Sequence, residues 1–323
     1  MLKTTILFLL FALGLGGCSY KVDIPTEFPT PPPNAAAKPL AKIAMIPDSE
    51  LEKQIAKIAE DAKGKVGVAA MMLETGEAAM LNSAEQFPMQ SVYKLPISMA
   101  VMDQVRRGHR NLDEKIGVTK DDMVRAGMRS PLRDASPNGG EFTIRELIRL
   151  AMVESDGTAS DVLMRGAGDG EVQSFLTQIG IANVKVANTE KEIGSDWQTQ
   201  YANWAMPVAA VSLLRWLDAA NNGDQDAEQN VWEELLKFMA ESSPGAKRLK
   251  ANLPPGSYVA HKTGTSGTQD GVTAATNDIG IIRLPSGKHF AIAVFVSDSK
   301  ADEKTREAII ARISKAVWDR WNK

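Results

Sequence analysis

Residues 87–102 read Phe87-Pro-Met-Gln-Ser-Val-Tyr-Lys-Leu-Pro-Ile-Ser-Met-Ala-Val-Met102, and the interpretation of the chain begins with this stretch. Ser91 and Lys94 stand three residues apart at the start of a long apolar run, which predicts a buried helix. At this spacing both side chains lie on one helix face, near free N–H groups at the helix N-terminus. A partly buried lysine loses its proton more easily and can accept the serine proton. The pair is therefore a candidate nucleophile and base.

The Ser-x-x-Lys spacing is a weak indicator by itself. Ser297 and Lys300 repeat it, and a capping serine beside a solvated lysine is its commoner explanation. Three further motifs follow Ser91 in order: Ser155-Asp156-Gly157 after a helix, Glu190 in the irregular stretch 188–192, and Lys262-Thr263-Gly264-Thr265 on a strand. Each is commonplace alone, but the ordered set matches serine enzymes that react with lactam rings.

Strand patterns lie at both ends of the folded part, with helix patterns between them. The β-type runs are 66–73, a partner after the turn at 74–76, and 258–263, 276–284 and 290–296. Helices are expected from about Asp48, from the capping box Thr143-Ile-Arg-Glu146, and at 158–165, 171–179, 207–220, 227–241 and 302–321.

This order predicts an α/β (α+β) fold: an antiparallel sheet flanked by the terminal helices, plus an inserted all-α domain. We assign residues 46–85 and 245–323 to a discontinuous α/β domain. Residues 86–244 form the all-α domain with the active-site loop. The site is expected at the seam between the two.

The N-terminus has the layout of a secretory signal peptide over residues 1–17, with Lys3 before a short apolar run. It ends in Leu15-Gly-Gly-Cys18, which resembles a bacterial lipoprotein processing site. We expect Cys18 to carry lipid and to anchor a periplasmic protein to a membrane; an ordinary cleaved signal is the alternative. Six prolines between Pro25 and Pro39 predict an extended tether within residues 18–45.

Composition narrows the remaining possibilities. A chain that is 44% hydrophobic and 24% charged is a folded protein, and a net charge of −3 does not suggest a nucleic-acid surface. Cys18 is the single cysteine, which excludes a disulfide within the chain. His109, His261 and His289 lack zinc-ligand spacing, so we expect no metal or cofactor. A monomer is the default expectation.

From about Asp48 to the C-terminus, the chain resembles a class A serine β-lactamase, and it looks most like the PER and VEB branch of extended-spectrum enzymes. The stretches that carry this resemblance are 87–91, 200–204, 260–267 and 274–278, together with Asp161, where other members carry Asn. The resemblance implies the fold shared by serine β-lactamases and penicillin-binding proteins, and hydrolysis of β-lactam antibiotics through an acyl-enzyme.

The resemblance also implies roles for the four motifs. Ser91 attacks the lactam carbonyl, activated by Lys94 alone or together with Glu190 through a water. Ser155 passes a proton to the departing nitrogen. Glu190 deprotonates the water that hydrolyses the acyl-enzyme. The backbone N–H groups of Ser91 and Thr265 form the oxyanion hole.

The substrate carboxylate is expected to meet Lys262, Thr263 and Thr265, while Gly264 leaves the strand edge open for substrate. Relatives often add an arginine from the neighbouring strand, and that position here falls near Asn277 and Asp278, so it is missing. Arg248 is the expected substitute, and a solvated surface arginine is the alternative.

Gly157 and Gly194 depart from the family pattern, since asparagines are usual at both positions. The amide usual at 157 contacts the substrate side chain and the active-site lysine, so we expect slower turnover of substrates that need it, and faster turnover in Gly157→Asn. Gly194, with Lys191 in place of a common proline, makes the loop around Glu190 unusual. Glu192 is the rival carboxylate.

Arg129 stands where an aromatic side chain often guards the mouth of the cleft. Its effect on specificity is left open.

Two other functions share part of this pattern. A penicillin-binding D,D-peptidase has the serine and lysine motifs but turns over β-lactams barely at all; Glu190 favours the lactamase. A non-catalytic lipoprotein or β-lactam sensor domain is the alternative from another class, and a sensor normally accompanies membrane helices.

Overall fold

The computed structural model describes residues 36–41, 43–223 and 230–323. The expected signal peptide, Cys18 and the tether up to residue 35 lie outside these ranges, as does Ala227, where a helix was expected to begin. Over the described residues, no helix is both long enough and apolar enough to cross a membrane.

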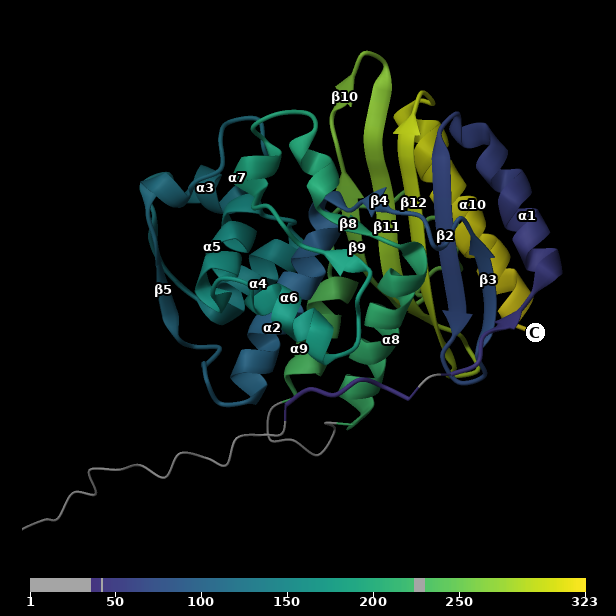
Figure 1. Cartoon of the computed structure of the whole chain (residues 1–323), viewed down its shortest axis with the longest axis horizontal. Helices are drawn as coiled ribbons and strands as arrows, with labels where there is room; N and C mark the ends of the chain where they lie inside the picture. The colour runs from purple at the N-terminus through teal and green to yellow at the C-terminus, as the bar shows by residue number, and fades with distance from the viewer. Residues whose placement is uncertain (1–35, 42, 224–229) are drawn as a thin grey trace, which may run out of the picture. The chain divides into compact units, whose positions relative to one another are not determined.

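The main sheet is built from the first hairpin and the last three long strands, as expected (Figure 1). Its strands run in the order β3 (Glu77–Leu81), β2 (Lys65–Met72), β12 (His289–Ser299), β11 (Val272–Arg283) and β9 (Val259–Thr265), all antiparallel to their neighbours.

Two short strands extend this sheet and correct the expectation that it is purely antiparallel. β10 (Thr268–Gln269) pairs with β11, and β1 (Ile46–Pro47) pairs with the outer edge of β3 in parallel. The parallel pair arises because the incoming chain runs along β3 in the same direction, with the Ile46 N–H donating to the Gly76 carbonyl. The sheet is therefore mixed.

Both faces of the sheet are covered, and alternate side chains enter two different cores. In β12, Ala291, Ala293 and Phe295 face one core, while Ile292 and Val294 face the other. The helices α1 (Ser49–Ala59) and α10 (Glu303–Trp321) cover the second face, and α8 (Pro207–Gly223) covers the first. Two buried faces explain why the strands read as continuous apolar runs.

The helical part is arranged around α2 (Lys94–Arg106), which is buried from Lys94 to Gln104. Packed on α2 are α4 (Ile144–Val153), α5 (Gly157–Ala167), α6 (Glu171–Gln178) and α9 (Val231–Ala240). The smaller elements are α3 (Pro131–Ala135), α7 (Glu190–Ile193), the pair β5 (Lys115–Val118) and β6 (Gly140–Thr143), and the ribbon β4 (Phe87–Pro88), β8 (Trp204–Ala205) and β7 (Val184–Lys185). The apolar run that follows Lys94 is thus the central helix of this part.

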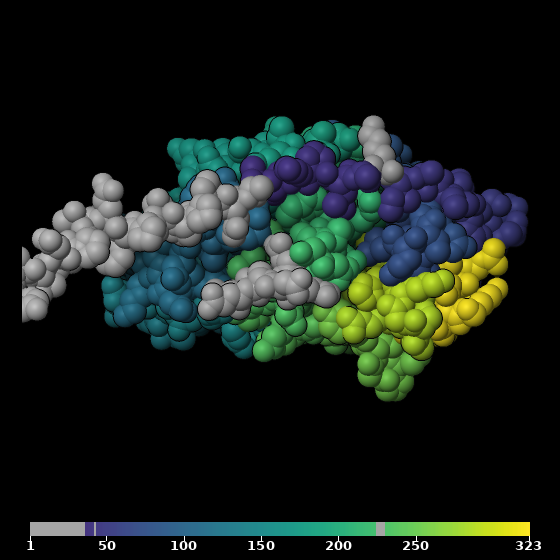
Figure 2. All heavy atoms as spheres, turned by 90° about the horizontal axis from the view of Figure 1, so that it is seen from below, coloured from purple at the N-terminus to yellow at the C-terminus, as the bar shows by residue number. Residues whose placement is uncertain are grey.

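Residues 36–41, expected to be tether, pack against α8 instead. Ala37 is buried, and the Lys38 carbonyl accepts a hydrogen bond from Trp216 Nε1 at 2.9 Å. Arg215 Nη2 donates to the Ala41 carbonyl at 2.8 Å. Figure 1 shows this segment running across the lower part of α8, and Figure 2 views the molecule from below. Packing therefore extends at least back to residue 36, about ten residues before the expected boundary at 46, because α8 offers donors to the carbonyls of this segment.

This packing predicts different results for two truncations. A chain starting at residue 36 keeps the melting temperature of the mature protein, whereas one starting at residue 42 loses both hydrogen bonds and melts lower. Trp216→Phe, which removes a single donor, is expected to lower Tm by about 2–4 °C. Equal Tm values for the two truncations, measured by thermal unfolding, would contradict the packing.

Candidate active site

Ser91 lies on a 3-10 turn, Gln90–Tyr93, that leads directly into α2. The turn is held from two sides. Gln90 has a left-handed φ of 47°, a strained conformation for this residue, and its Nε2 donates to Gln200 Oε1 at 2.6 Å. Asn277 Nδ2, from β11, donates to the carbonyls of Pro88 at 2.8 Å and Met89 at 3.1 Å. Strand β11 thus fixes the chain that presents the serine.

Lys94 is almost completely buried and joins three of the predicted residues. Its Nζ donates to Ser91 Oγ at 2.8 Å, to the Ser155 carbonyl at 3.2 Å and to Glu190 Oε2 at 2.9 Å. An ammonium group has three donor hydrogens, so each has a partner here. The structure therefore brings the first three motifs together at a single nitrogen.

Ser155 connects this lysine to the fourth motif. Lys262 Nζ, fully buried on β9, donates to Ser155 Oγ at 2.9 Å. Burial, followed by the nearby charge of Lys94, lowers the pKa of Lys262 well below its usual value. Asp156 holds the turn, because its carboxylate accepts hydrogen bonds from the Ala159 N–H at 2.9 Å and the Leu132 N–H at 2.6 Å.

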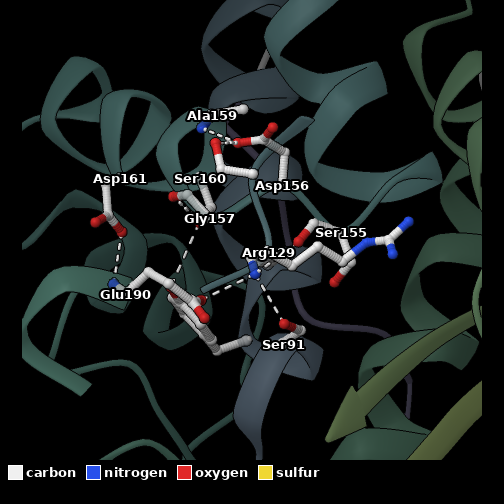
Figure 3. Close-up of polar contacts among 12 residues, drawn as sticks. Ser91, Arg129, Ser155, Asp156, Gly157, Ala159, Ser160, Asp161 and Glu190 are labelled. Atoms are coloured by element: carbon white, nitrogen blue, oxygen red, sulfur yellow. Dashed lines mark hydrogen bonds and ion pairs between the residues drawn. The ribbon is translucent and has the colours of Figure 1, made fainter. Parts of the chain in front are cut away.

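Glu190 is the first residue of α7, a single helical turn on the loop expected to carry it. Asp161 on α5 accepts the N–H groups of Glu190 at 2.6 Å and Lys191 at 3.0 Å, which orients this turn (Figure 3). Glu192 instead completes a capping box with Thr189. Of the two carboxylates considered, Glu190 is the one that reaches Lys94.

Neighbouring side chains fill the space beside two glycines in the site. A Cβ atom built at Gly157 would lie 2.7 Å from Glu190 Cγ, and one at Gly194 would lie 2.6 Å from Met128 Sδ. The structure therefore predicts a different outcome for Gly157→Asn from the restored contact expected from the sequence, because Glu190 occupies the space that the new side chain needs.

The structure gives a second reason for Gly264, besides the substrate access expected from the sequence. A Cβ atom there would lie 2.2 Å from the Met89 carbonyl oxygen, a collision with main chain. The glycine lets β9 approach the segment just before Ser91. A side chain at this position would collide with the main chain, so glycine is the residue that allows this approach.

Arg248 is buried behind β9 rather than solvated on the surface. Its Nη2 donates to Thr265 Oγ1 at 2.8 Å, and its Nη1 to the carbonyls of Gly264 at 3.2 Å and Asn277 at 3.0 Å. Glu307 on α10 accepts from its Nε at 3.2 Å. Arg248 supports Thr265 from behind and is not among the residues that line the cleft.

These elements surround a cleft of about 530 Å³. Its walls include Ser91, Ser155, Glu190, Thr263 and Thr265. A larger hollow of about 710 Å³ lies between α8, α9 and the far ends of the strands, and none of the motif residues lines it.

Other residues considered from the sequence lie in different settings. Arg129 is exposed at the cleft and pairs with Glu154 at 3.1 Å. His261 is buried against Asp278 at 2.9 Å. The second Ser-x-x-Lys begins on strand β12, where Ser297 is buried, so it lacks the helix N-terminus that favours the first.

Tyr93, for which no role is predicted from the sequence, also belongs to the site. Its hydroxyl donates to Glu190 Oε2 at 3.0 Å. The signal available in the sequence was a hydroxyl-bearing side chain directly before the motif lysine in an otherwise apolar segment.

Burial raises the pKa of Asp161 from 3.8 to about 7, against the lowering effect of the two N–H groups it accepts. The folded protein then keeps a proton that the unfolded chain has already released, so the free energy of unfolding falls as pH rises from about 4 to about 7. Asp161→Asn lacks this proton. Its stability relative to the unmodified protein, from urea unfolding across this range, is expected to improve as pH rises. A pH-independent difference would count against the assignment.

Comparison with known proteins agrees with this geometry. A model of the beta-lactamase enzyme family matches residues 50–321. Beta-lactamase VEB-1 of Pseudomonas aeruginosa is 36% identical over 270 residues, 83% of this chain and 89% of that protein. Extended-spectrum beta-lactamase PER-1 of the same organism is 35% identical over 271 residues, 83% of this chain and 86% of that protein.

Solved structures give the same result. The crystal structure of TLA-3 extended-spectrum beta-lactamase superposes with a TM-score of 0.80 at 41% identity, covering 85% of this chain and 99% of that one. A beta-lactamase from Chitinophaga pinensis gives 0.79 at 40% identity, covering 84% and 99%. Because similarity of this extent runs through both the sheet and the helical part, the chain belongs to the class A serine β-lactamases and hydrolyses β-lactam antibiotics.

Proposed function

We propose that this β-lactamase works through an acyl-enzyme on Ser91, with Lys94 and Glu190 acting as one proton-exchanging unit. The observation that supports this is the position of Lys94 Nζ, 2.8 Å from Ser91 Oγ and 2.9 Å from Glu190 Oε2. Moving one ammonium proton to Glu190 leaves a neutral amine. That amine takes the proton of Ser91 as the serine oxygen attacks the lactam carbonyl carbon.

The lactam C–N bond then breaks, and the nitrogen needs a proton. Ser155 supplies it through its hydroxyl, and Lys262, 2.9 Å from Ser155 Oγ, replaces the proton. The lowered pKa of Lys262 makes its ammonium a better acid for this task. Ser91 is left as an ester of the opened ring.

Glu190 acts again in deacylation. The hydrogen bonds that its carboxylate accepts from the described residues all end on Oε2, which leaves Oε1 to hold a water. Before this step Glu190 releases to solvent the proton it took from Lys94, and the neutral Lys262 takes up a proton from solvent. The ionised Glu190 then takes a proton from the bound water as the water adds to the ester carbonyl. The bond to Ser91 Oγ breaks, and the serine recovers its proton through Lys94.

The substrate is held by β9. The N–H groups of Ser91 and Thr265 stabilise the oxyanion. Lys262, Thr263 and Thr265 bind the substrate carboxylate, and Arg248 contributes positive charge through its contact with Thr265 at 2.8 Å. Gly264 and Gly157 act by the space they leave.

The activity also implies a location. Enzymes that destroy β-lactams protect the cell best outside the inner membrane, and the N-terminal sequence fits export with a lipid anchor at Cys18. We propose a monomeric, periplasmic lipoprotein.

Hydrolysis of a chromogenic cephalosporin by the unmodified protein, Ser91→Ala and Glu190→Ala tests the mechanism. Steady turnover is expected only in the unmodified protein. Intact-mass spectrometry should find no adduct on Ser91→Ala, which lacks the nucleophile, and a persistent acyl-enzyme on Glu190→Ala, which lacks the base. A single burst from the unmodified protein would instead indicate a D,D-peptidase.

The anchor is tested by fractionating cells that express the full chain or Cys18→Ser. The full chain should sediment with membranes because of its acyl chains, and the variant should not carry lipid. Identical membrane association and no lipid mass on the mature full chain would rule out the anchor.

A further inference from the structure

We propose that Tyr93 and Gly157 are positioning residues for the Glu190 carboxylate in deacylation: Tyr93 holds the carboxylate with a hydrogen bond, and Gly157 leaves the space in which it lies. This inference rests on the proposed role of Glu190 as the base that activates water. It adds a residue within the Ser-x-x-Lys motif that is neither nucleophile nor base.

The contact is buried and directional. Tyr93 is fully buried, and its hydroxyl donates to Glu190 Oε2 at 3.0 Å, with Ser160 Oγ 3.4 Å away. Lys94 donates to the same oxygen at 2.9 Å. Two donors on Oε2 hold the carboxylate in one orientation and turn Oε1 away from both.

Gly157 makes this orientation possible. A Cβ atom there would lie 2.7 Å from Glu190 Cγ, and it would also press on the Arg129 carbonyl and Val124 Cγ1, each at 3.3 Å. Glu190 therefore packs against bare backbone at the start of α5, beside Ser160 (Figure 3). A side chain at position 157 would displace Glu190 from its position against this backbone.

Unlike the charged groups around Glu190, Tyr93 keeps its proton throughout the proposed reaction. Lys94 and Lys262 exchange protons during the proposed reaction, Asp161 holds the backbone of α7, and Lys191 and Glu192 follow on α7 itself. Burial, then the charges of Glu190 and Asp161, raise the pKa of Tyr93 well above its usual value. Its hydroxyl thus remains a donor throughout the cycle, including steps in which Lys94 is neutral.

The decisive measurement is the decay of preformed acyl-enzyme, followed by intact mass over a range of pH. Tyr93→Phe keeps the ring and loses the donor. Its deacylation rate should fall about tenfold, because the lost hydrogen bond was made to a charged group. The acid limb of the rate profile should move to higher pH, since the lost donor stabilised the ionised carboxylate.

Acylation should change less than deacylation. For a substrate limited by deacylation, kcat and KM then fall together and kcat/KM changes by less than about threefold. Tyr201→Phe is the matched control, because its hydroxyl donates to Asp298 at 2.7 Å and not to Glu190. That control should leave the decay rate and its pH profile unchanged.

Gly157→Asn tests the second half of the inference. It should slow deacylation by displacing Glu190. Combined with Tyr93→Phe, which frees Glu190 to move, its effect should be smaller than the product of the two separate effects.

Three results separate the possible failures. An unchanged decay rate and pH profile in Tyr93→Phe overturns the inference, and so does an equal loss of acylation and deacylation with no shift of the acid limb. If Glu190→Ala itself deacylates at the unmodified rate, the proposed role of Glu190 is wrong, whatever Tyr93 does.

Discussion

The ammonium group of Lys94 is the constraint on which the rest of the site depends. It is buried at the start of the central helix, where an unpaired charge would be very costly. Its three hydrogens are satisfied by Ser91, Ser155 and Glu190, which come from three separate parts of the chain. Stability and the proposed chemistry share this requirement, because the groups that make the buried charge tolerable include those proposed to exchange protons with it.

Each partner of Lys94 is in turn held by a buried side chain that bonds to main chain. Asn277 fixes the segment before Ser91, Asp156 fixes the turn after Ser155, and Asp161 fixes the first turn of α7. Main-chain bonds set the direction of a whole segment, so they restrict the catalytic side chains more firmly than contacts between flexible side chains. The carboxylate of Asp161 keeps a raised pKa as the cost of this arrangement.

Several features followed from the sequence because they are local or periodic. The capping box at Thr143 and Glu146, the apolar helix after Lys94 and the set of strands that form the main sheet agree with the structure. The parallel strand β1 and the packed segment 36–41 did not follow, since both depend on what the incoming chain meets at the sheet edge and at α8. The close contacts at Gly157 and Gly264 could not be predicted for the same reason. A glycine in a sequence does not reveal which distant atom approaches it.

The sequence by itself determined the chemistry available: two serines, two lysines and a carboxylate in a family order. It also determined the type of most elements that carry them, through their apolar patterns. Only the tertiary structure decided how these groups meet. It placed Glu190 rather than Glu192 beside Lys94, placed Arg248 behind Thr265, and brought the hydroxyl of Tyr93 to a carboxylate 97 residues away. The physical reason is the different range along the chain over which these influences act. Backbone propensity and side-chain periodicity act over a few residues, whereas the approach of distant segments is set by close packing of the whole molecule.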